Sequence, residues 1–220
     1  MPRHFLTGSE LSADELLALL DRAAELKAAP RSSDALREEL AAEGTIPVFN
    51  MLTAGHHPCQ ALADLLTLRE AFGRLEGLKL TYVGDGNNVA RSLVVLGGLA
   101  GVEVVVSSPP GYELEGVETV TDPAQAVRGA HAVYADVWVS MGDEATADAR
   151  RAALAPYRID DALLDRAAPD AIALHCLPAH PGEEITAEVL YGRRQRIWDE
   201  AENRRHAQKA LLEWLLATTA

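Results

Sequence analysis

The stretch Leu78-Lys-Leu-Thr-Tyr-Val-Gly-Asp-Gly-Asn-Asn88 decides the fold. Its first six residues are apolar enough for a buried strand, and the glycines and asparagines that follow are typical of a tight turn. An apolar run long enough for a helix comes next at 89–99, and 102–106 has the composition of a second strand. This order of elements predicts the parallel strand pairing of a Rossmann-like unit.

The rest of the chain continues the alternation of strands and helices. Further strands are expected at 46–50, 117–120, 132–135, 171–174 and 196–198, and further helices at 9–29, 34–42, 58–72, 122–128, 159–167 and 202–216. We therefore expect an α/β fold, with a Rossmann-like parallel sheet covered by helices and a truncated helical N-terminal part. The expected domains are 1–74, 75–198 and 199–220, with the last helix packing back on the first part.

The composition predicts a protein with an apolar core and an acidic surface. The chain has 220 residues, 48% of them hydrophobic, and a formal net charge of −13. Such a chain is poorly suited to nucleic-acid phosphates or an anionic membrane. No run approaches the roughly 18 apolar residues of a membrane span, the N-terminus lacks a signal-peptide core, and two cysteines make no disulfide framework. These features favour a cytoplasmic protein.

The glycine turn begins like a dinucleotide-binding fingerprint but does not complete it. A valine stands where the third glycine belongs, and Ser107-Ser108 stand where an acidic residue would bind a ribose hydroxyl. A nicotinamide cofactor is therefore disfavoured. Asn87 and Asn88 can instead present amides to a small polar ligand, or they can simply favour the turn itself.

Polar residues also follow the strand expected at 132–135. Asp136 leaves its end, where an unpaired carboxylate would be costly. It could pair a ligand ammonium group, with Ser140 adding a hydroxyl, or it could be a helix cap or a structural ion-pair partner. Met141 taken alone favours core packing. Because ligands of open parallel sheets bind beyond the carboxyl ends of the strands, this segment is a candidate site.

Histidines and cysteines gather in two segments, His56-His-Pro-Cys-Gln60 and His175-Cys-Leu-Pro178. Cys176 could be a nucleophile with His57 or His175 as its base. Alternatively, it is a buried thiol that packs as a small hydrophobic group. A metal site is disfavoured because no spacing matches a zinc pattern.

Arg204 stands near the start of the last expected helix, after Asp199-Glu-Ala-Glu-Asn203. The acidic residues suit a helix N-terminus, whereas an arginine there opposes the helix dipole. Arg204 could therefore grip an anion, or it could be a solvated side chain.

Together these segments resemble ornithine carbamoyltransferase, of the aspartate/ornithine carbamoyltransferase family. The matching stretches occur in the family order: Pro2–Leu6, His57–Asp64, Tyr82–Asn88, Asp136–Gly142, His175–Pro178 and Trp198–Arg204. The fourth stretch is similar to the ornithine enzymes rather than the aspartate enzymes. The resemblance implies transfer of the carbamoyl group of carbamoyl phosphate to the δ-amine of ornithine, giving citrulline and phosphate. It places the chain in arginine biosynthesis or degradation, or in the urea cycle.

The resemblance implies a role for each residue on the carbamoyl phosphate side. His57 would hydrogen-bond the carbamoyl oxygen, where charge grows during attack, and Gln60 would orient the carbamoyl amide. Arg204 and the backbone around Cys176 and Leu177 would hold the same substrate. His57, Cys176 and Arg204 form the implied catalytic group.

The ornithine side is implied in the same way. Asp136 would pair the α-ammonium group, with Asn88, Ser140 and Met141 around the α-carboxylate and the stem. Cys176 would sit beside the reacting δ-amine. The family needs no metal or organic cofactor and is usually a homotrimer.

One family segment is absent from the sequence. The family grips the phosphate with a Ser-Thr-Arg-Thr-Arg segment at a helix start, and no such segment occurs here. Arg31 could stand for a further family arginine, or begin a reduced anion site. Two hypotheses follow: a compact working ornithine carbamoyltransferase, or a catalytically impaired relic that keeps an amino-acid-binding site.

Overall fold

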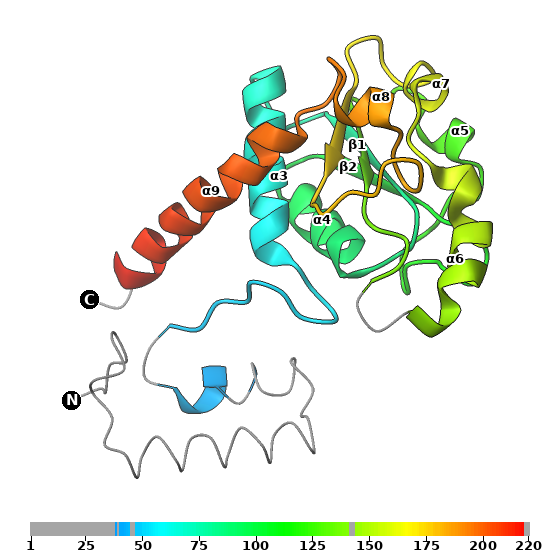
Figure 1. Ribbon diagram of the computed structural model, residues 1–220. Helices are drawn as coiled ribbons and strands as arrows, with labels where there is room; N and C mark the ends of the chain where they lie inside the picture. The colour runs from blue at the N-terminus through cyan, green and yellow to red at the C-terminus, as the bar shows by residue number, and fades with distance from the viewer. Residues whose placement is uncertain (1–37, 39, 45–46, 141–143, 218–220) are drawn as a thin grey trace. The chain divides into compact units, whose positions relative to one another are not determined.

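The computed structural model describes residues 38, 40–44, 47–140 and 144–217 (Figure 1). The expected helix at 9–29, Arg31 and Met141 lie outside the described residues. Residues 40–43 are helical, as expected for the segment 34–42. The residues from Phe49 onward form one compact unit.

A parallel sheet of four strands organises this unit. Its strand order is β2-β1-β3-β4, with β1 at Lys79–Val83, β2 at Glu103–Ser107, β3 at Ala132–Ala135 and β4 at Ile172–His175. In the register, Tyr82 lies beside Val106 on one side and Tyr134 on the other. The expected Rossmann-like parallel sheet is confirmed.

Three expected strands are wrong. Residues 47–50 are irregular, although their neighbours at 45–46 are not described. In the segment 117–120, Thr119 makes only an isolated bridge to Val106. The segment 196–198 belongs mostly to a helix that begins at Ile197. Apolar composition alone suggested strands there, but each segment finds no complete ladder of backbone partners.

Helices lie between the strands. Their bounds are α3 Pro58–Phe72, α4 Asn88–Leu99, α5 Pro123–Ala126, α6 Ala147–Leu154, α7 Asp161–Leu164, α8 Ala187–Leu190 and α9 Ile197–Ala217, with short 3₁₀ turns at Glu144–Thr146 and Ala155–Tyr157. Proline at the first position starts α3, and Gly73 in the left-handed conformation ends it. None of the described helices combines the length and hydropathy that crossing a membrane would require.

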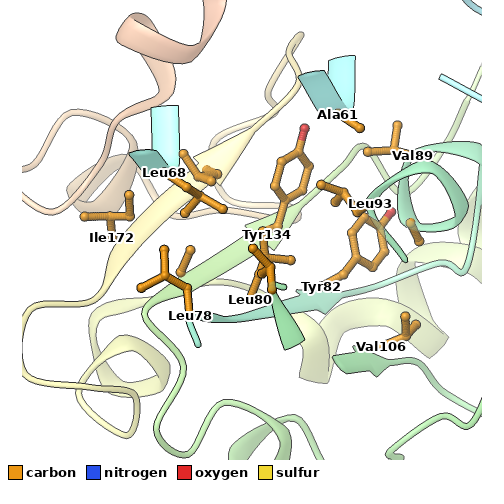
Figure 2. Close-up of a cluster of buried hydrophobic side chains, with 14 of the residues drawn as sticks. Ala61, Leu68, Leu78, Leu80, Tyr82, Val89, Leu93, Val106, Tyr134 and Ile172 are labelled. Atoms are coloured by element: carbon orange, nitrogen blue, oxygen red, sulfur yellow. The ribbon is translucent and has the colours of Figure 1, made fainter. Parts of the chain in front are cut away.

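The core consists of two apolar clusters on the two faces of the sheet. Side chains alternate along each strand, so Tyr82 joins one cluster and its neighbour Val83 joins the other. The first cluster packs under α3 and α4 and contains the stacked rings of Tyr82 and Tyr134, 5.9 Å apart (Figure 2). The second packs under α7 and α8. Helices therefore cover both faces, and the strand ends stay open for polar residues.

Candidate active site

The candidate site forms where α3, α4 and α9 meet the carboxyl ends of β1, β3 and β4. The turn after β1 starts α4, because the Asn87 side chain accepts hydrogen bonds from the N–H groups of Val89 and Ala90. α3 and α9 pack against each other across the edge of the sheet (Figure 1). This packing brings residues from both ends of the compact unit to one place.

His57 is held at the start of α3 with a free ring nitrogen. Its backbone N–H donates to Ser92 Oγ at 2.7 Å, and its side chain is buried. Burial and then the charge of Arg204 lower the pKa of His57, against smaller opposing effects of the Met51 carbonyl and Asp136. The imidazole is therefore neutral at pH 7, and its buried Nδ1 has no hydrogen-bond partner among the described residues.

Arg204 reaches the same place from α9. Its Nη1 donates to Gln60 Oε1 at 2.6 Å, across 144 positions of sequence. Its Nε is buried and has no acceptor in the described part of the chain. A buried guanidinium N–H without an acceptor is costly. A small ligand with an oxygen acceptor would satisfy Arg204 Nε, and His57 Nδ1 can accept from or donate to the same ligand according to the tautomer of its ring.

Gln60 is the site residue whose surroundings differ most from expectation. It is 1% exposed, and its Nε2 donates to Asp64 Oδ1 and Glu200 Oε1, each at 2.8 Å. Its Oε1 accepts from Arg204. Its two amide hydrogens are thus already used inside the protein.

Asp136 and Cys176 meet at the ends of β3 and β4. The Cys176 thiol donates to Asp136 Oδ1 at 2.9 Å, and Asn87 Nδ2 donates to Asp136 Oδ2 at 2.6 Å. Burial, and then the charge and hydrogen bond of Asp136, raise the pKa of Cys176 well above its ordinary value. Cys176 is therefore a neutral thiol at pH 7, which disfavours a thiolate nucleophile.

The other expected ornithine-side residues are placed less closely. Asn88 Nδ2 donates to the Thr53 carbonyl at 2.6 Å, which ties the loop before α3 to the start of α4. Ser140 is half-buried in the segment after β3. Met141 cannot be placed because it lies outside the described residues.

A buried pair supports the backbone after β4. The Leu177 N–H donates to His175 Nδ1 at 2.8 Å, and His175 Nε2 lies 3.2 Å from Glu184 Oε1. Leu177 has a positive φ of 58°, unusual for a residue with a branched side chain. Glu184 thus sets the tautomer of His175, and the ring holds the Leu177 backbone. This arrangement leaves His175 no nitrogen to serve as a base for Cys176.

Sequence reasoning missed Asp64, Glu200 and Glu184 as members of the site. All three are 0% exposed. Their sequence positions carry one usable signal, since Asp64 lies one helical turn after Gln60 and Glu200 lies one turn before Arg204. In the described part of the chain, no three metal-binding side chains gather in a way that could hold an ion.

Comparison with known proteins assigns the family. The model for the aspartate/ornithine carbamoyltransferase Asp/Orn binding domain matches residues 76–215, well over half of the chain. The chain belongs to the aspartate/ornithine carbamoyltransferase family. A second family model, for the carbamoyl-P binding domain, matches only residues 31–70. The family expected from the motifs is thereby confirmed.

Ornithine carbamoyltransferases of known name are about half identical to the chain over the residues that match. The ornithine carbamoyltransferase of Acidothermus cellulolyticus is 55% identical over 193 residues, covering 80% of this chain and 62% of the relative. That of Symbiobacterium thermophilum is 53% identical over 195 residues, covering 81% and 63%. The chain therefore spans less than two thirds of the length of these relatives.

Solved carbamoyltransferase structures have the same fold. The ornithine carbamoyltransferase of Gloeobacter violaceus superposes with a TM-score of 0.76 at 49% identity, covering 82% of this chain and 66% of that one. The enzyme from Thermus thermophilus gives 0.78 at 39% identity, covering 96% and 75%. The α/β class is confirmed by both.

Proposed function

We propose that the chain transfers the carbamoyl group of carbamoyl phosphate to the δ-amine of L-ornithine, giving L-citrulline and phosphate. The observation that carries the proposal is the pair of unpaired buried nitrogens, His57 Nδ1 and Arg204 Nε. They lie near the Asp136–Cys176 pair, since the charges of both Arg204 and Asp136 act on His57. A carbamoyl oxygen supplies the acceptor that Arg204 Nε lacks, and an amino acid supplies an ammonium group for Asp136.

The reaction needs positioning and electrostatic stabilisation more than covalent help from the protein. The δ-amine nitrogen attacks the carbamoyl carbon and loses a proton, and the bond to the phosphate oxygen breaks with its electrons leaving on phosphate. Neutral His57 and cationic Arg204 stabilise the charge that grows on the carbamoyl oxygen. The backbone at Cys176 and Leu177 holds the carbamoyl group at the attacking nitrogen, and Gln60, whose amide is bound by Asp64 and Glu200, orients this group through Arg204.

The acceptor amino acid occupies the Asp136 side. Its α-ammonium group pairs with Asp136, and Asn88, Ser140 and Met141 surround its carboxylate and stem. The neutral thiol of Cys176 sits beside the δ-amine, where it donates to Asp136 instead of competing as a nucleophile.

Citrulline formation from the two purified substrates tests the proposal. Arg204→Gln is expected to lower kcat/KM by roughly a hundredfold or more, as loss of a charge-stabilising donor does. Arg205→Gln is the matched control, because Arg205 is exposed on the same helix and pairs only with Glu202 in the described structure. No citrulline above an enzyme-free control would sink the proposal.

A second candidate is an amino-acid-binding protein that does not transfer the carbamoyl group. It is favoured by the missing Ser-Thr-Arg-Thr-Arg segment and by the short match, 31–70, to the carbamoyl-P binding domain. Calorimetry would then detect ornithine binding that Asp136→Ala abolishes and the exposed-site control Asp148→Ala does not. Ornithine binding without citrulline formation would decide for this candidate.

The remaining expectations about the chain are part of the same proposal. They are a division into 1–74, 75–198 and 199–220, a homotrimer, a cytoplasmic location and no metal or organic cofactor. The solved relatives support the α/β family fold on which these expectations rest. Light scattering on the purified chain measures the assembly directly.

A further inference from the structure

Two buried carboxyl groups lie behind Gln60 and Arg204. Asp64 of α3 and Glu200 of α9 are both 0% exposed, and one amide nitrogen, Gln60 Nε2, lies 2.8 Å from each. Neither group has a role in the proposed reaction. Two carboxylates with so little exposure cannot both be charged without a large free-energy cost.

The hydrogen-bond donors around the pair are distributed unequally. Glu200 accepts from three donors: Gln60 Nε2, the Tyr134 hydroxyl at 3.1 Å and the His175 N–H at 3.0 Å. Asp64 has one close donor, Gln60, since the Tyr134 hydroxyl is 3.5 Å away, and Oδ2 of Asp64 has none in the described part of the chain. Glu200 is therefore solvated as an anion by the protein, whereas Asp64 has an oxygen that fits a proton.

The electrostatics point the same way. Burial and then the charge of Glu200 raise the pKa of Asp64 well above its ordinary value. Burial also raises the pKa of Glu200, but hydrogen bonds from Asp64, the His175 backbone and Tyr134 oppose the effect. Both effects place the proton on Asp64, which then donates a hydrogen bond to an ionised Glu200.

We propose that Asp64 and Glu200 share one proton, carried by Asp64, and act as a positioning pair that fixes Gln60 and, through it, Arg204. Both hydrogens of the Gln60 amide point to the two carboxyl groups, so its oxygen must face Arg204 Nη1. The guanidinium is then held through Nη1, and its buried Nε has no acceptor in the described part of the chain. The positioning role rests on the proposed function, whereas the shared proton does not.

Thermal unfolding as a function of pH tests the proton without any need for activity. In the folded protein Asp64 keeps its proton above pH ~3.9, where the unfolded chain releases it, so rising pH disfavours folding by up to about tenfold per pH unit. Asp64→Asn mimics the protonated group, since its NH₂ donates to Glu200, and it removes this dependence. The Tm difference, variant minus wild type, is therefore expected to rise from pH 5 to pH 7.

The other titratable or charged groups that act on the pair are Arg204, His175, Tyr134 and, for Tyr134, Cys176 and Asp136. They are common to wild type and Asp64→Asn, so their own titration largely cancels in the difference. A Tm difference that stays flat or falls with pH would overturn the assignment of the proton to Asp64.

Glu200→Gln tests the other half of the pair. Its NH₂ group must face either the Gln60 and Tyr134 donors or the His175 N–H, so no orientation of the amide satisfies all three. We expect Tm to fall by about 5 °C or more and KM for carbamoyl phosphate to rise about tenfold, with a smaller change in kcat.

Thr67→Val is the matched control for simple destabilisation. Thr67 is buried in the same α3–α9 interface, where it accepts from Asn203 Nδ2 at 3.0 Å, and it does not touch Gln60. Its loss should lower Tm but leave KM for carbamoyl phosphate unchanged. An equal rise in KM for both variants would contradict positioning. If wild type makes no citrulline, the proposed function fails while the unfolding measurement still decides the shared proton.

Discussion

The thiol of Cys176 and the carboxylate of Asp136 form a hydrogen bond, with Sγ 2.9 Å from Oδ1. The bond joins the end of β4 to the end of β3, two neighbouring strands of the sheet. The Cys176 thiol is therefore a hydrogen-bond donor, which explains why this partly buried thiol at a candidate active site is not the nucleophile.

Removing the Asp136 charge should make Cys176 more reactive. Asp136→Asn, in a Cys59→Ala background, is expected to shift the pH dependence of alkylation by iodoacetamide to lower pH, because Asp136 is the next largest cause of the raised thiol pKa after burial. Mass spectrometry gives the rates between pH 7 and 10. Asp148→Asn, a change at an exposed carboxylate, should leave the alkylation rates unchanged. Slower alkylation of Asp136→Asn than of the parent protein would contradict the proposed effect of Asp136 on the thiol.

The glycine turn after β1 should be intolerant of a methyl group at one position. A Cβ on Gly86 would lie 2.4 Å from the Leu114 backbone nitrogen, so we expect Gly86→Ala to lower Tm by about 5 °C or more. Gly98→Ala is the control, because Gly98 lies in α4 with open space around it. Alanine there should stabilise by about 1 kcal/mol. Thermal unfolding of the two variants in parallel checks both signs.

Glu184 should matter as the buried acceptor for His175. Glu184→Leu leaves His175 Nε2 without its partner and is expected to cost about 3 kcal/mol in the free energy of unfolding. Glu184→Gln keeps an acceptor oxygen and should cost less than half as much. Urea unfolding measures both. Equal costs would show that packing, and not the tautomer of His175, holds the Leu177 backbone.

Protonation of His57 should destabilise the fold. Because its folded-state pKa is lowered, the folded protein binds fewer protons than the unfolded chain below pH ~6.5. Stability is therefore lost as the pH falls from about 6.5 toward the lowered pKa, by at most about 1.4 kcal/mol per pH unit. His57→Asn should remove this slope, whereas His206→Asn, at an exposed histidine, should not. A steeper slope in His57→Asn would contradict the prediction.

The sheet was predictable because its signals are local. The helix expected at 89–99 is α4, at Asn88–Leu99, and the strand expected at 78–83 is β1, at Lys79–Val83. Strand ends of a parallel sheet share one edge, so Asp136 and Cys176 could be expected near each other before any contact was known. Their hydrogen bond follows from that topology.

The error at 196–198 has a physical cause. Ile197 and Trp198 are apolar, and in a short window a strand and a helix start cannot be separated by periodicity. The acidic residues Asp199 and Glu200 lie in the first turn of α9, which is the signal that the helix begins earlier than 202. Arg204 consequently lies in the second turn of α9, one turn beyond Glu200.

The buried carboxyl groups were beyond sequence reasoning. Acidic residues in helices are ordinarily solvated, and the one local signal, the spacing of Asp64 and Glu200 by one helical turn from Gln60 and Arg204, does not indicate that they are buried. Their burial depends on α3 packing against α9, a contact between segments about 140 positions apart. The same distance in sequence explains why Gln60 was expected only to orient the carbamoyl amide, whereas its own amide contacts Asp64, Glu200 and Arg204.

The hydrogen bond between Arg204 and Gln60 also sets an order of events during synthesis. The four strands and α3 are synthesised before α9, since α9 begins at Ile197. A nascent chain that has folded its strands but not yet added α9 lacks the guanidinium of Arg204 and the carboxyl group of Glu200, and Gln60 and Asp64 remain open to water. A chain that lacks α9 therefore keeps the strand-end thiol and carboxylate but has no Arg204 cation beside His57.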